Sequence, residues 1–437
     1  MSKNIKDQQA ILQKLGISEL NPMQLAAKQA ISENDEVVLL SPTGTGKTLA
    51  FLLPIIANLD PELNEAQVLI LVPSRELAIQ IEQVVREMGS GFKANAVYGG
   101  RAGSKDKIEL KHAPAILIGT PGRIADHFRR ETISTDHIQT IVLDEFDKSL
   151  EVGFETEMIE ILDELRTAKQ KILTSATQKV EIPAFVGLKS PTQLDFLDQA
   201  TNNLSLKMVT ADTKDKSAAL VQLLGHIQEG NGIIFCNFKD TIQEVSDYLS
   251  DHHISHSCFY GGLEQQDRER ALIKFRNGTS RLLLATDLAA RGIDVPALDF
   301  IVHFQLPPKE EEFTHRNGRT ARMNQNGIAY LLKGKNERVP DFATNIKEEH
   351  ISNTKPFQDS QLCTLFISGG RKDKVSKGDI AGLFMKQGGL NKDELGMIEL
   401  KQDCAFVAVP TSKSNQLIKQ LNNSRLKKKK VRISQLN

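Results

Sequence analysis

The stretch SPTGTGKT (41–48) follows the apolar run EVVLL (36–40) and leads into a second apolar segment. Its glycines let the backbone curl until several N–H groups point at one place, and a lysine and a threonine close the curl. Such N–H groups and a lysine bind phosphate, and a threonine hydroxyl can bind Mg²⁺. The stretch therefore predicts a nucleotide-phosphate site formed by Ser41, which replaces the usual first glycine, and by Pro42, Thr43, Gly44, Thr45, Gly46, Lys47 and Thr48.

Three carboxylates crowd into the four residues DEFD that follow the apolar run TIVL (140–143). Like charges this close repel each other, so a cation or strong hydrogen bonds must offset the repulsion. At the end of another strand of a phosphate-loop fold, these side chains would face the same nucleotide. We expect Asp144, with Thr48, to hold Mg²⁺, and Glu145 to orient and polarise the attacking water. Asp147 can hydrogen-bond to a neighbouring loop, and ATP with Mg²⁺ is the expected substrate pair.

The elements that must position these residues alternate between short β-rich apolar runs and helical segments from residue 25 to about 335. This alternation predicts parallel sheets covered by helices on both faces. It lapses at 198–207, so we expect a linker there between two α/β domains, 1–197 and 208–346. Strands are expected at 36–40, 67–73, 115–121, 140–144 and 171–177, and then at 232–237, 254–262, 281–287, 299–305 and 327–332.

A third unit, 362–437, follows a polar stretch at 347–361 that we expect to be a second linker. Its apolar segments follow the order β-α-β-β-α-β, which predicts a small ferredoxin-like α+β sandwich. From Gln361 onward there are 15 Lys+Arg and 6 Asp+Glu, a net charge of +9, so the rest of this neutral chain carries −9. A basic module is typical of nucleic-acid binding, although its run KKKK (427–430) can equally be a solvated charged turn.

Ten motifs occur in the order found in the DEAD-box ATP-dependent RNA helicases, and this resemblance covers residues from about 5 to 345. Beside the two stretches above they are Gln24 within NPMQ, PSRELA (73–78), Gly99-Gly100, TPGR (120–123), SAT (175–177), QQDR (265–268), TDLAARGID (286–294) and HRNGRTAR (315–322). The resemblance implies two tandem RecA-like domains and an RNA-dependent ATPase and helicase.

The resemblance also implies roles at the nucleotide. Gln24 resembles the glutamine that reads adenine, and Asp294 resembles a ribose contact. Arg319 and Arg322 resemble arginine fingers that reach the terminal phosphate from the second domain, and His315 would help to position water. With Lys47, Asp144 and Glu145, these last three residues make up the expected catalytic set.

Further residues resemble the family's coupling and RNA contacts. Ser175 and Thr177 resemble the partners of Asp147 that couple the ATP state to domain closure. The implied contacts are to the sugar-phosphate backbone and carry little base information. They would be made by Pro73, Arg75, Gly100, Thr120 and Arg123 in the first domain and by Thr286 in the second.

Four features depart from the family pattern. Phe146 stands where the family has alanine, so packing beside the coupling loop must differ. Asn317 and Ala321 replace the commoner isoleucine and glycine of the last motif. Residues 1–20 contain no aromatic side chain upstream of Gln24, which implies weaker stacking on adenine.

The third unit resembles the DbpA-type RNA-binding domains, which have an RRM-like fold and in their family direct the helicase to large-subunit ribosomal RNA. The resemblance rests on the basic run after Gly369-Gly370, on GDI and on the spaced LG-x-I. RNA binding would rely on Arg371, Lys372 and the basic run 425–432. Phe406 is the one aromatic in QDCAFVAVP, and we interpret it as core and not as a base-stacking residue.

The combined prediction is an ATP-dependent RNA helicase that opens short duplexes during assembly of the large ribosomal subunit. No run approaches the ~20 apolar residues of a membrane span and the N-terminus lacks a signal-peptide core, so we expect a cytoplasmic protein with no membrane contact. We also expect a monomer whose partner is RNA, in particular ribosomal RNA. Two alternatives remain open. One is a DNA helicase of the same superfamily, and the other is an ATP-gated RNA clamp with weak turnover, which Phe146 would suit.

Overall fold

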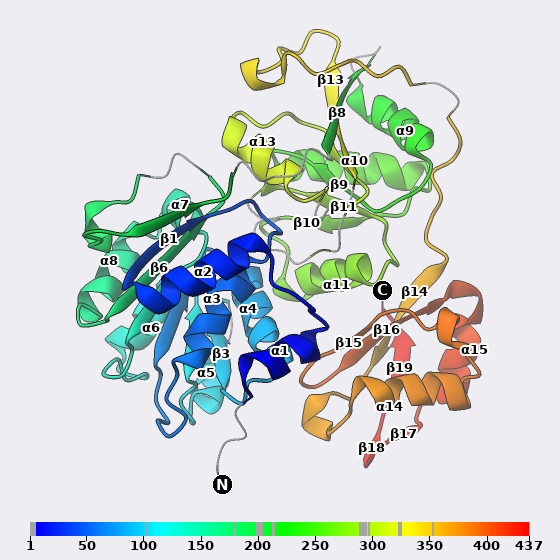
Figure 1. Cartoon of the computed structure of the whole chain (residues 1–437). Coiled ribbons are helices and arrows are strands. Elements are labelled where there is room, and N and C mark those ends of the chain that lie inside the picture. The colour runs from blue at the N-terminus through cyan, green and yellow to red at the C-terminus, as the bar shows by residue number, and fades with distance from the viewer. Residues whose placement is uncertain are drawn as a thin grey trace. The chain divides into compact units, whose positions relative to one another are not determined.

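The computed structural model describes residues 6–100, 103–177, 181–197, 204–211, 215–287, 295, 298–321, 326–351 and 354–436 (Figure 1). The chain divides into two units, and the described residues up to 197 belong to the first while those from 204 belong to the second. Within the described residues, no helix combines the length and the apolar character needed to cross a membrane.

The first unit is a parallel-sheet domain with seven strands in the order β3-β4-β2-β5-β6-β1-β7. The strands are β1 (Glu36–Leu40), β2 (Val68–Leu71), β3 (Ala94–Val97), β4 (Ile116–Gly119), β5 (Thr140–Leu143), β6 (Gln170–Ser175) and β7 (Thr192–Asp195). The helices are α1 (Gln8–Leu15), α2 (Pro22–Glu33), α3 (Lys47–Ala57), α4 (Arg75–Met88), α5 (Gly103–Glu109), α6 (Pro121–Arg129), α7 (Phe146–Glu151) and α8 (Glu155–Glu164).

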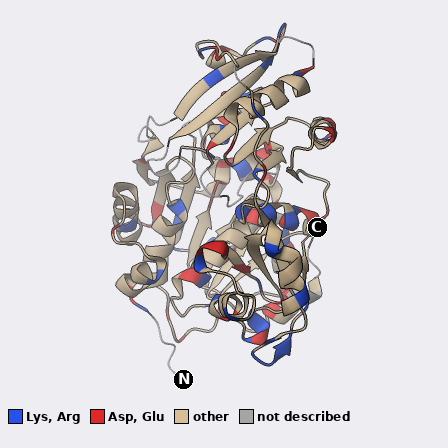
Figure 2. Ribbon diagram, turned by 90° about the vertical axis from the view of Figure 1, so that its right-hand side faces the viewer, with Lys and Arg blue, Asp and Glu red and all other residues tan. Residues whose placement is uncertain are grey.

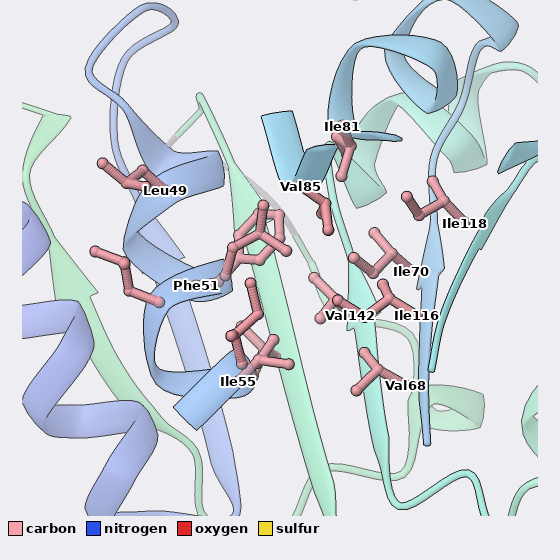
Figure 3. Packing of buried hydrophobic residues seen from close by; sticks show 14 of the residues in the cluster. Leu49, Phe51, Ile55, Val68, Ile70, Ile81, Val85, Ile116, Ile118 and Val142 are labelled. Carbon is pink, nitrogen blue, oxygen red and sulfur yellow. The ribbon is translucent and has the colours of Figure 1, made fainter. Parts of the chain in front are cut away.

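Strand β2 shows why these segments are continuous apolar runs. Val68 and Ile70 belong to the cluster that includes α3 and α4, whereas Leu69 and Leu71 belong to the cluster on the opposite face. A strand buried on both faces needs apolar residues at every position. Figure 3 shows the first cluster, where Leu49, Phe51 and Ile55 of α3 and Ile81 and Val85 of α4 pack over the sheet. The predicted helix-covered parallel sheet is confirmed.

A second parallel-sheet domain lies in the second unit, with strand order β10-β11-β9-β12-β13-β8. Its strands are β8 (Leu204–Ala211), β9 (Gly232–Phe235), β10 (Ser257–Phe259), β11 (Leu282–Ala285), β12 (Phe300–His303) and β13 (Gly327–Gly334). Its helices include α9 (Lys216–Ile227), α10 (Lys239–Asp251), α11 (Gln265–Arg276) and α13 (Glu310–Asn317). Strand β8 starts at Leu204, within the stretch expected to be a linker, because its full length pairs with β13.

The second unit also contains a C-terminal domain with an antiparallel sheet in the order β15-β16-β14-β19. Its elements are β14 (Leu362–Ile367), α14 (Lys377–Gly382), β15 (Ile398–Leu400), β16 (Ala405–Pro410), α15 (Thr411–Leu421) and β19 (Ile433–Gln435). This is the predicted β-α-β-β-α-β order. The sequence did not predict the hairpin of β17 (Arg425–Leu426) and β18 (Lys429–Lys430), which contains the KKKK run.

The described part of 347–361 packs against the second parallel-sheet domain. Phe357 joins its apolar cluster and lies edge-on to Phe300, with ring centroids 6.4 Å apart. The Lys355 N–H donates to the Gly225 carbonyl at 2.9 Å, and the Ser255 hydroxyl donates to Asp359 at 3.0 Å. These contacts hold the chain against the domain as it leads into β14.

Candidate nucleotide and RNA site

The sheet order of the first domain places the predicted site residues along one edge. The phosphate loop, the DEFD carboxylates and the SAT residues follow β1, β5 and β6, which are neighbours in the sheet. The predicted RNA contacts follow β2, β3 and β4, which are also neighbours. Because the carboxyl ends of parallel strands share one edge, this edge divides into a nucleotide half and an RNA half.

The phosphate loop curls as its sequence predicts. Gly44 and Gly46 have φ of 80° and 89°, in the left-handed region that favours glycine. The loop ends where α3 begins at Lys47, so the first N–H groups of the helix point toward the loop. Lys47 is 9% exposed and its Nζ donates to the Pro42 carbonyl at 3.0 Å. The lysine therefore already lies over the loop, where a phosphate would bind.

Gln24, the predicted adenine reader, lies directly beside this loop. It takes part in the capping box of α2, because its Oε1 accepts from the Asn21 N–H at 3.0 Å and its own N–H donates to Asn21 Oδ1 at 2.8 Å. A Cβ atom at Gly46 would lie 2.5 Å from Gln24 Nε2. The Asn21 amide also donates to the Thr45 carbonyl at 3.0 Å. The start of α2 is thus fixed against the loop.

Asp144 is buried at the end of β5, with 3% exposure. Burial raises the pKa of its carboxyl group, while a hydrogen bond from Thr174 and the charge of Lys47 lower it. Thr174 Oγ1 donates to Asp144 Oδ1 and accepts from the Glu145 N–H at 3.2 Å. Glu145 has φ 49° and ψ 48°, a left-handed conformation that is uncommon for a residue other than glycine. The sequence assigned no role to Thr174.

The three predicted coupling residues are brought together in the first domain. Thr177 Oγ1 donates to Asp147 Oδ2 at 3.2 Å, and the Thr177 N–H donates to Ser175 Oγ at 3.0 Å. Phe146 does not lie among these polar groups. Its ring is 1% exposed and belongs to the apolar cluster that contains Met158. The contact between Asp147 and Thr177 therefore forms with phenylalanine in the DEFD motif.

In the second parallel-sheet domain, Arg316 joins the ends of three strands. Its Nε donates to Asp287 Oδ1 at 2.6 Å, and its Nη1 and Nη2 donate at 2.7 Å to the Gln305 carbonyl and to Asn237 Oδ1. Arg316 is 1% exposed, so these bonds satisfy a buried charge. Sequence reasoning missed it, although its position between two motif residues, within HRNGR, was the available signal.

The other predicted residues of this domain are only partly described. His315 lies in α13, and Arg319, which is 7% exposed, follows that helix. Thr286 comes directly after β11. Asp294 and Arg322 lie outside the described residues.

The departure at Asn317 has a structural partner. Its Oδ1 lies 3.0 Å from Nε2 of His303, which is fully buried at the end of β12. Burial, aided by the nearby charge of Arg316, lowers the pKa of His303 to about 3. The imidazole is therefore neutral at pH 7, and an acceptor on Asn317 requires the proton on Nε2.

The RNA half of the first-domain edge contains two arginines in different settings. Arg75 is the first residue of α4, and a Cβ at Gly100 would lie 2.5 Å from its Nη1. Arg123 donates to Asp106 Oδ2 at 2.9 and 2.7 Å and to Asp126 Oδ2 at 2.9 Å. Thr120 is the N-cap of α6, and Pro73, which is buried, follows β2.

The C-terminal domain brings Lys372 close to the β17–β18 hairpin. Lys429 pairs with Asp373 at 2.7 Å, and Lys427 pairs with Asp379 at 3.0 Å. Arg371 and Lys372 lie in the short helix that starts after Gly370. In Figure 2 the Lys and Arg residues of the hairpin are blue. We call the following residues the basic patch: Lys372, Lys374, Lys377, Lys427, Lys428, Lys429 and Lys430.

One face of the C-terminal sheet is occupied by the second parallel-sheet domain. Arg276 donates to Glu399 at 2.8 Å, and the Thr279 and Thr364 hydroxyls are 3.0 Å apart. Burial alone would raise the pKa of Glu399, but the charges of Lys401 and Arg276 lower it overall. Phe406, on the same sheet face, is 7% exposed and lies against Phe366. Phe406 is therefore not an exposed base-stacking side chain, as the sequence indicated.

Three family models match successive parts of the chain. Residues 21–184 match the DEAD/DEAH box helicase family, 215–324 match the helicase conserved C-terminal domain, and 364–435 match the DbpA RNA binding domain. The chain is 33% identical to the ATP-dependent RNA helicase DbpA of Escherichia coli, over 97% of this chain and 95% of that protein. It is 29% identical to DbpA of Bacillus subtilis, over 98% and 96%.

A solved structure, Saccharomyces cerevisiae Dbp5 bound to RNA and ADP BeF3, is similar to this chain with a TM-score of 0.66 and 26% identity, over 76% of this chain and 88% of that one. This chain and the Dbp5 structure share the two RecA-like parallel-sheet domains. The C-terminal domain has a family match of its own. The chain belongs to the DEAD-box ATP-dependent RNA helicases of the DbpA type and is an RNA-dependent ATPase and helicase of that family.

Proposed function

We propose that this helicase uses ATP hydrolysis to open short RNA duplexes in large-subunit ribosomal RNA during ribosome assembly. One observation carries the first half of this proposal: the nucleotide half and the RNA half lie side by side on one edge of the first sheet. A change in the nucleotide bound at the ends of β5, β6 and β1 can therefore alter the binding of RNA at the ends of β2, β3 and β4. The similar Dbp5 structure was solved with RNA and a nucleotide analogue.

The proposed nucleotide chemistry uses residues of both parallel-sheet domains. The loop N–H groups from Ser41 to Thr48 and the Lys47 ammonium would bind the phosphates, and Gln24 would contact adenine. Glu145 would orient the attacking water. Hydrolysis would also require His315, Arg319 and Arg322 from the second domain, with Asp294 at the ribose, so turnover depends on domain closure.

The residues present fit a Mg²⁺ ion that arrives with the nucleotide. No group of three or more His, Cys, Asp or Glu that could hold a metal occurs among the described residues, so a dedicated protein cage is absent there. Magnesium commonly uses one or two protein oxygens and takes its remaining ligands from phosphates and water. Thr48 and the buried Asp144 would supply those oxygens, and the ion would neutralise charge on the phosphates.

On the RNA half, Pro73, Arg75, Gly100, Thr120 and Arg123, with Thr286 from the second domain, would hold the sugar-phosphate backbone. A strand bent across both domains cannot stay paired, so opening is local. The coupling of nucleotide state to RNA binding would use Asp147, Ser175 and Thr177. The hydrogen bonds among these residues form with Phe146 in place. That observation favours a working motor over a clamp with weak turnover.

The C-terminal domain would select the RNA. Its sheet face packs against the second parallel-sheet domain, so recognition would fall to the basic patch and Arg371. We propose a working division into 1–197, 208–346 and 362–437, in a monomer that acts in the cytoplasm. Holding the third part against the second would fix the distance between the recognised RNA and the duplex that is opened.

Strand displacement from a short RNA duplex tests the motor. The full chain should separate the duplex only with ATP, and Glu145→Gln should bind ATP and RNA without displacement. Glu155→Gln, an exposed carboxylate at the start of α8, is the matched control and should retain activity. ATP-dependent RNA binding with no displacement by the unaltered chain would support the clamp, and displacement from DNA alone would support the DNA helicase.

A lysine-to-glutamine series tests the target. The first variant replaces three residues of the basic patch together: Lys427, Lys428 and Lys430. The second variant replaces three exposed lysines elsewhere in the same domain: Lys386, Lys392 and Lys419. Both variants lose three charges. Preference for ribosomal over unrelated structured RNA should disappear only in the first variant. Equal preference in both would refute selection by the patch.

A further inference from the structure

Thr174 lies at the end of β6, between the acidic strand β5 and the phosphate-loop strand β1. In the sheet register, Leu143 pairs with Leu173 on one side and Leu39 pairs with Thr174 on the other. Asp144 directly follows β5, and the loop begins two residues after Leu39. Thr174 therefore belongs to the strand that lies between the strand before the proposed metal carboxylate and the strand before the phosphate loop.

The hydroxyl of Thr174 is used on both sides. Oγ1 donates its proton to Asp144 Oδ1 and accepts the Glu145 N–H at 3.2 Å. Thr174 is fully buried and Asp144 is 3% exposed, so water does not compete for these bonds. A hydrogen bond to a buried carboxylate is worth more than one between neutral groups.

The two bonds act on different properties of the acidic pair. The bond to Asp144 selects one orientation of its carboxylate, which must be set before an oxygen can face a metal ion. The bond from Glu145 supports the left-handed backbone at φ 49°, which directs the chain from β5 into α7. Such a backbone is kept only where surrounding contacts determine it. A single hydroxyl therefore bonds to the Asp144 carboxylate and to the backbone of Glu145.

We propose that Thr174 is a positioning residue that holds Asp144 and Glu145 ready for the magnesium–nucleotide complex. The inference rests on the proposed role of Asp144 in holding Mg²⁺. It assigns to the residue before the SAT triplet a function in metal-dependent nucleotide binding, separate from the coupling contacts of Ser175 and Thr177.

Equilibrium binding of a fluorescent, non-hydrolysable ATP analogue to the full chain, titrated with Mg²⁺, tests this without relying on turnover. Thr174→Val keeps the branched shape but removes both hydrogen bonds. It should raise the half-saturating Mg²⁺ concentration by about tenfold or more, in line with the loss of a bond to a buried charge. Binding measured in excess EDTA should stay unchanged, because the phosphate loop is intact.

Three variants separate the hydroxyl from the shape of the side chain. Thr174→Ser restores the hydroxyl and should return the Mg²⁺ dependence to that of the unaltered chain. Thr140→Val, at the opposite end of β5, should have no effect. If Thr174→Val disturbs folding, Thr174→Ala gives the same test with a side chain that cannot clash.

Overlapping Mg²⁺ curves for Thr174→Val, Thr174→Ala and the unaltered chain would overturn the inference. So would a serine variant as weak as the valine variant, because shape and not the hydroxyl would then matter. If the unaltered chain binds the analogue with no Mg²⁺ dependence, the proposed metal role of Asp144 fails, and the inference fails with it.

Discussion

Replacing Phe146 with alanine would restore the letters DEAD to this motif, yet the structure predicts damage. The ring is 1% exposed and belongs to the cluster with Met158, Ile161 and Leu165. Removing a buried phenylalanine ring costs its transfer free energy and leaves a cavity, in total about 3–5 kcal/mol. Since domains are commonly stable by only about 5–15 kcal/mol, this is a large part of the stability of the first domain.

Urea unfolding of the full chain, with and without ATP and Mg²⁺, provides the assay. The transition that ATP shifts to higher urea belongs to the first domain, because the phosphate loop proposed to bind the nucleotide lies in that domain. Phe146→Ala should lower the unfolding free energy of that transition by about 3–5 kcal/mol. Phe238→Ala, a side chain 65% exposed in the second domain, should change stability by no more than about 0.5 kcal/mol. A loss below 1 kcal/mol at Phe146 would refute the packing account.

Three further changes have defined outcomes. Because burial keeps the pKa of His303 at about 3, the unfolded chain binds a proton below pH 6.5 that the folded chain does not. The unfolding free energy should therefore decrease as the pH is lowered, by about 1.4 kcal/mol at pH 5.5. His303→Asn should remove this decrease in pH-dependent urea unfolding, and an unchanged dependence on pH would contradict the prediction. Arg276→Ala removes a partner of Glu399 and should destabilise the second unit by about 1–3 kcal/mol in thermal unfolding. Replacing the exposed Arg270 with alanine should have little effect. Equal effects would count against a stabilising contact between Arg276 and Glu399. Lys47→Ala should abolish productive ATP binding measured by calorimetry, and unchanged affinity would remove Lys47 from the site.

The sequence predicted the main strands because a parallel strand buried on both faces must be apolar throughout, as β2 is. The same reasoning missed β3, whose ANAV contains a polar residue, and β7, whose TQLD has no apolar run. It also missed β8, and it placed the first residues of this strand in a linker. Their pairing with β13, more than 100 residues later in the chain, leaves no local signal.

The nucleotide side of the candidate site was predictable because its residues occupy short motifs with fixed spacing. Thr174 was not, because a threonine within KILTS is an ordinary β-branched strand residue until β5 is placed beside it. The pairing of His303 with Asn317 was hidden for the same reason, since 14 positions separate them. What the sequence could not supply in each case was the identity of the spatial neighbour.

Steady-state ATP hydrolysis by the full chain tests the central claim most directly, with no nucleic acid, ribosomal RNA, an unrelated structured RNA, or single-stranded DNA. We predict strong stimulation by ribosomal RNA, weaker stimulation by the unrelated RNA and none by DNA. Equal stimulation by both RNAs would discard selection by the C-terminal domain. No stimulation by any of them, with ATP still bound, would contradict the account of an RNA-driven motor.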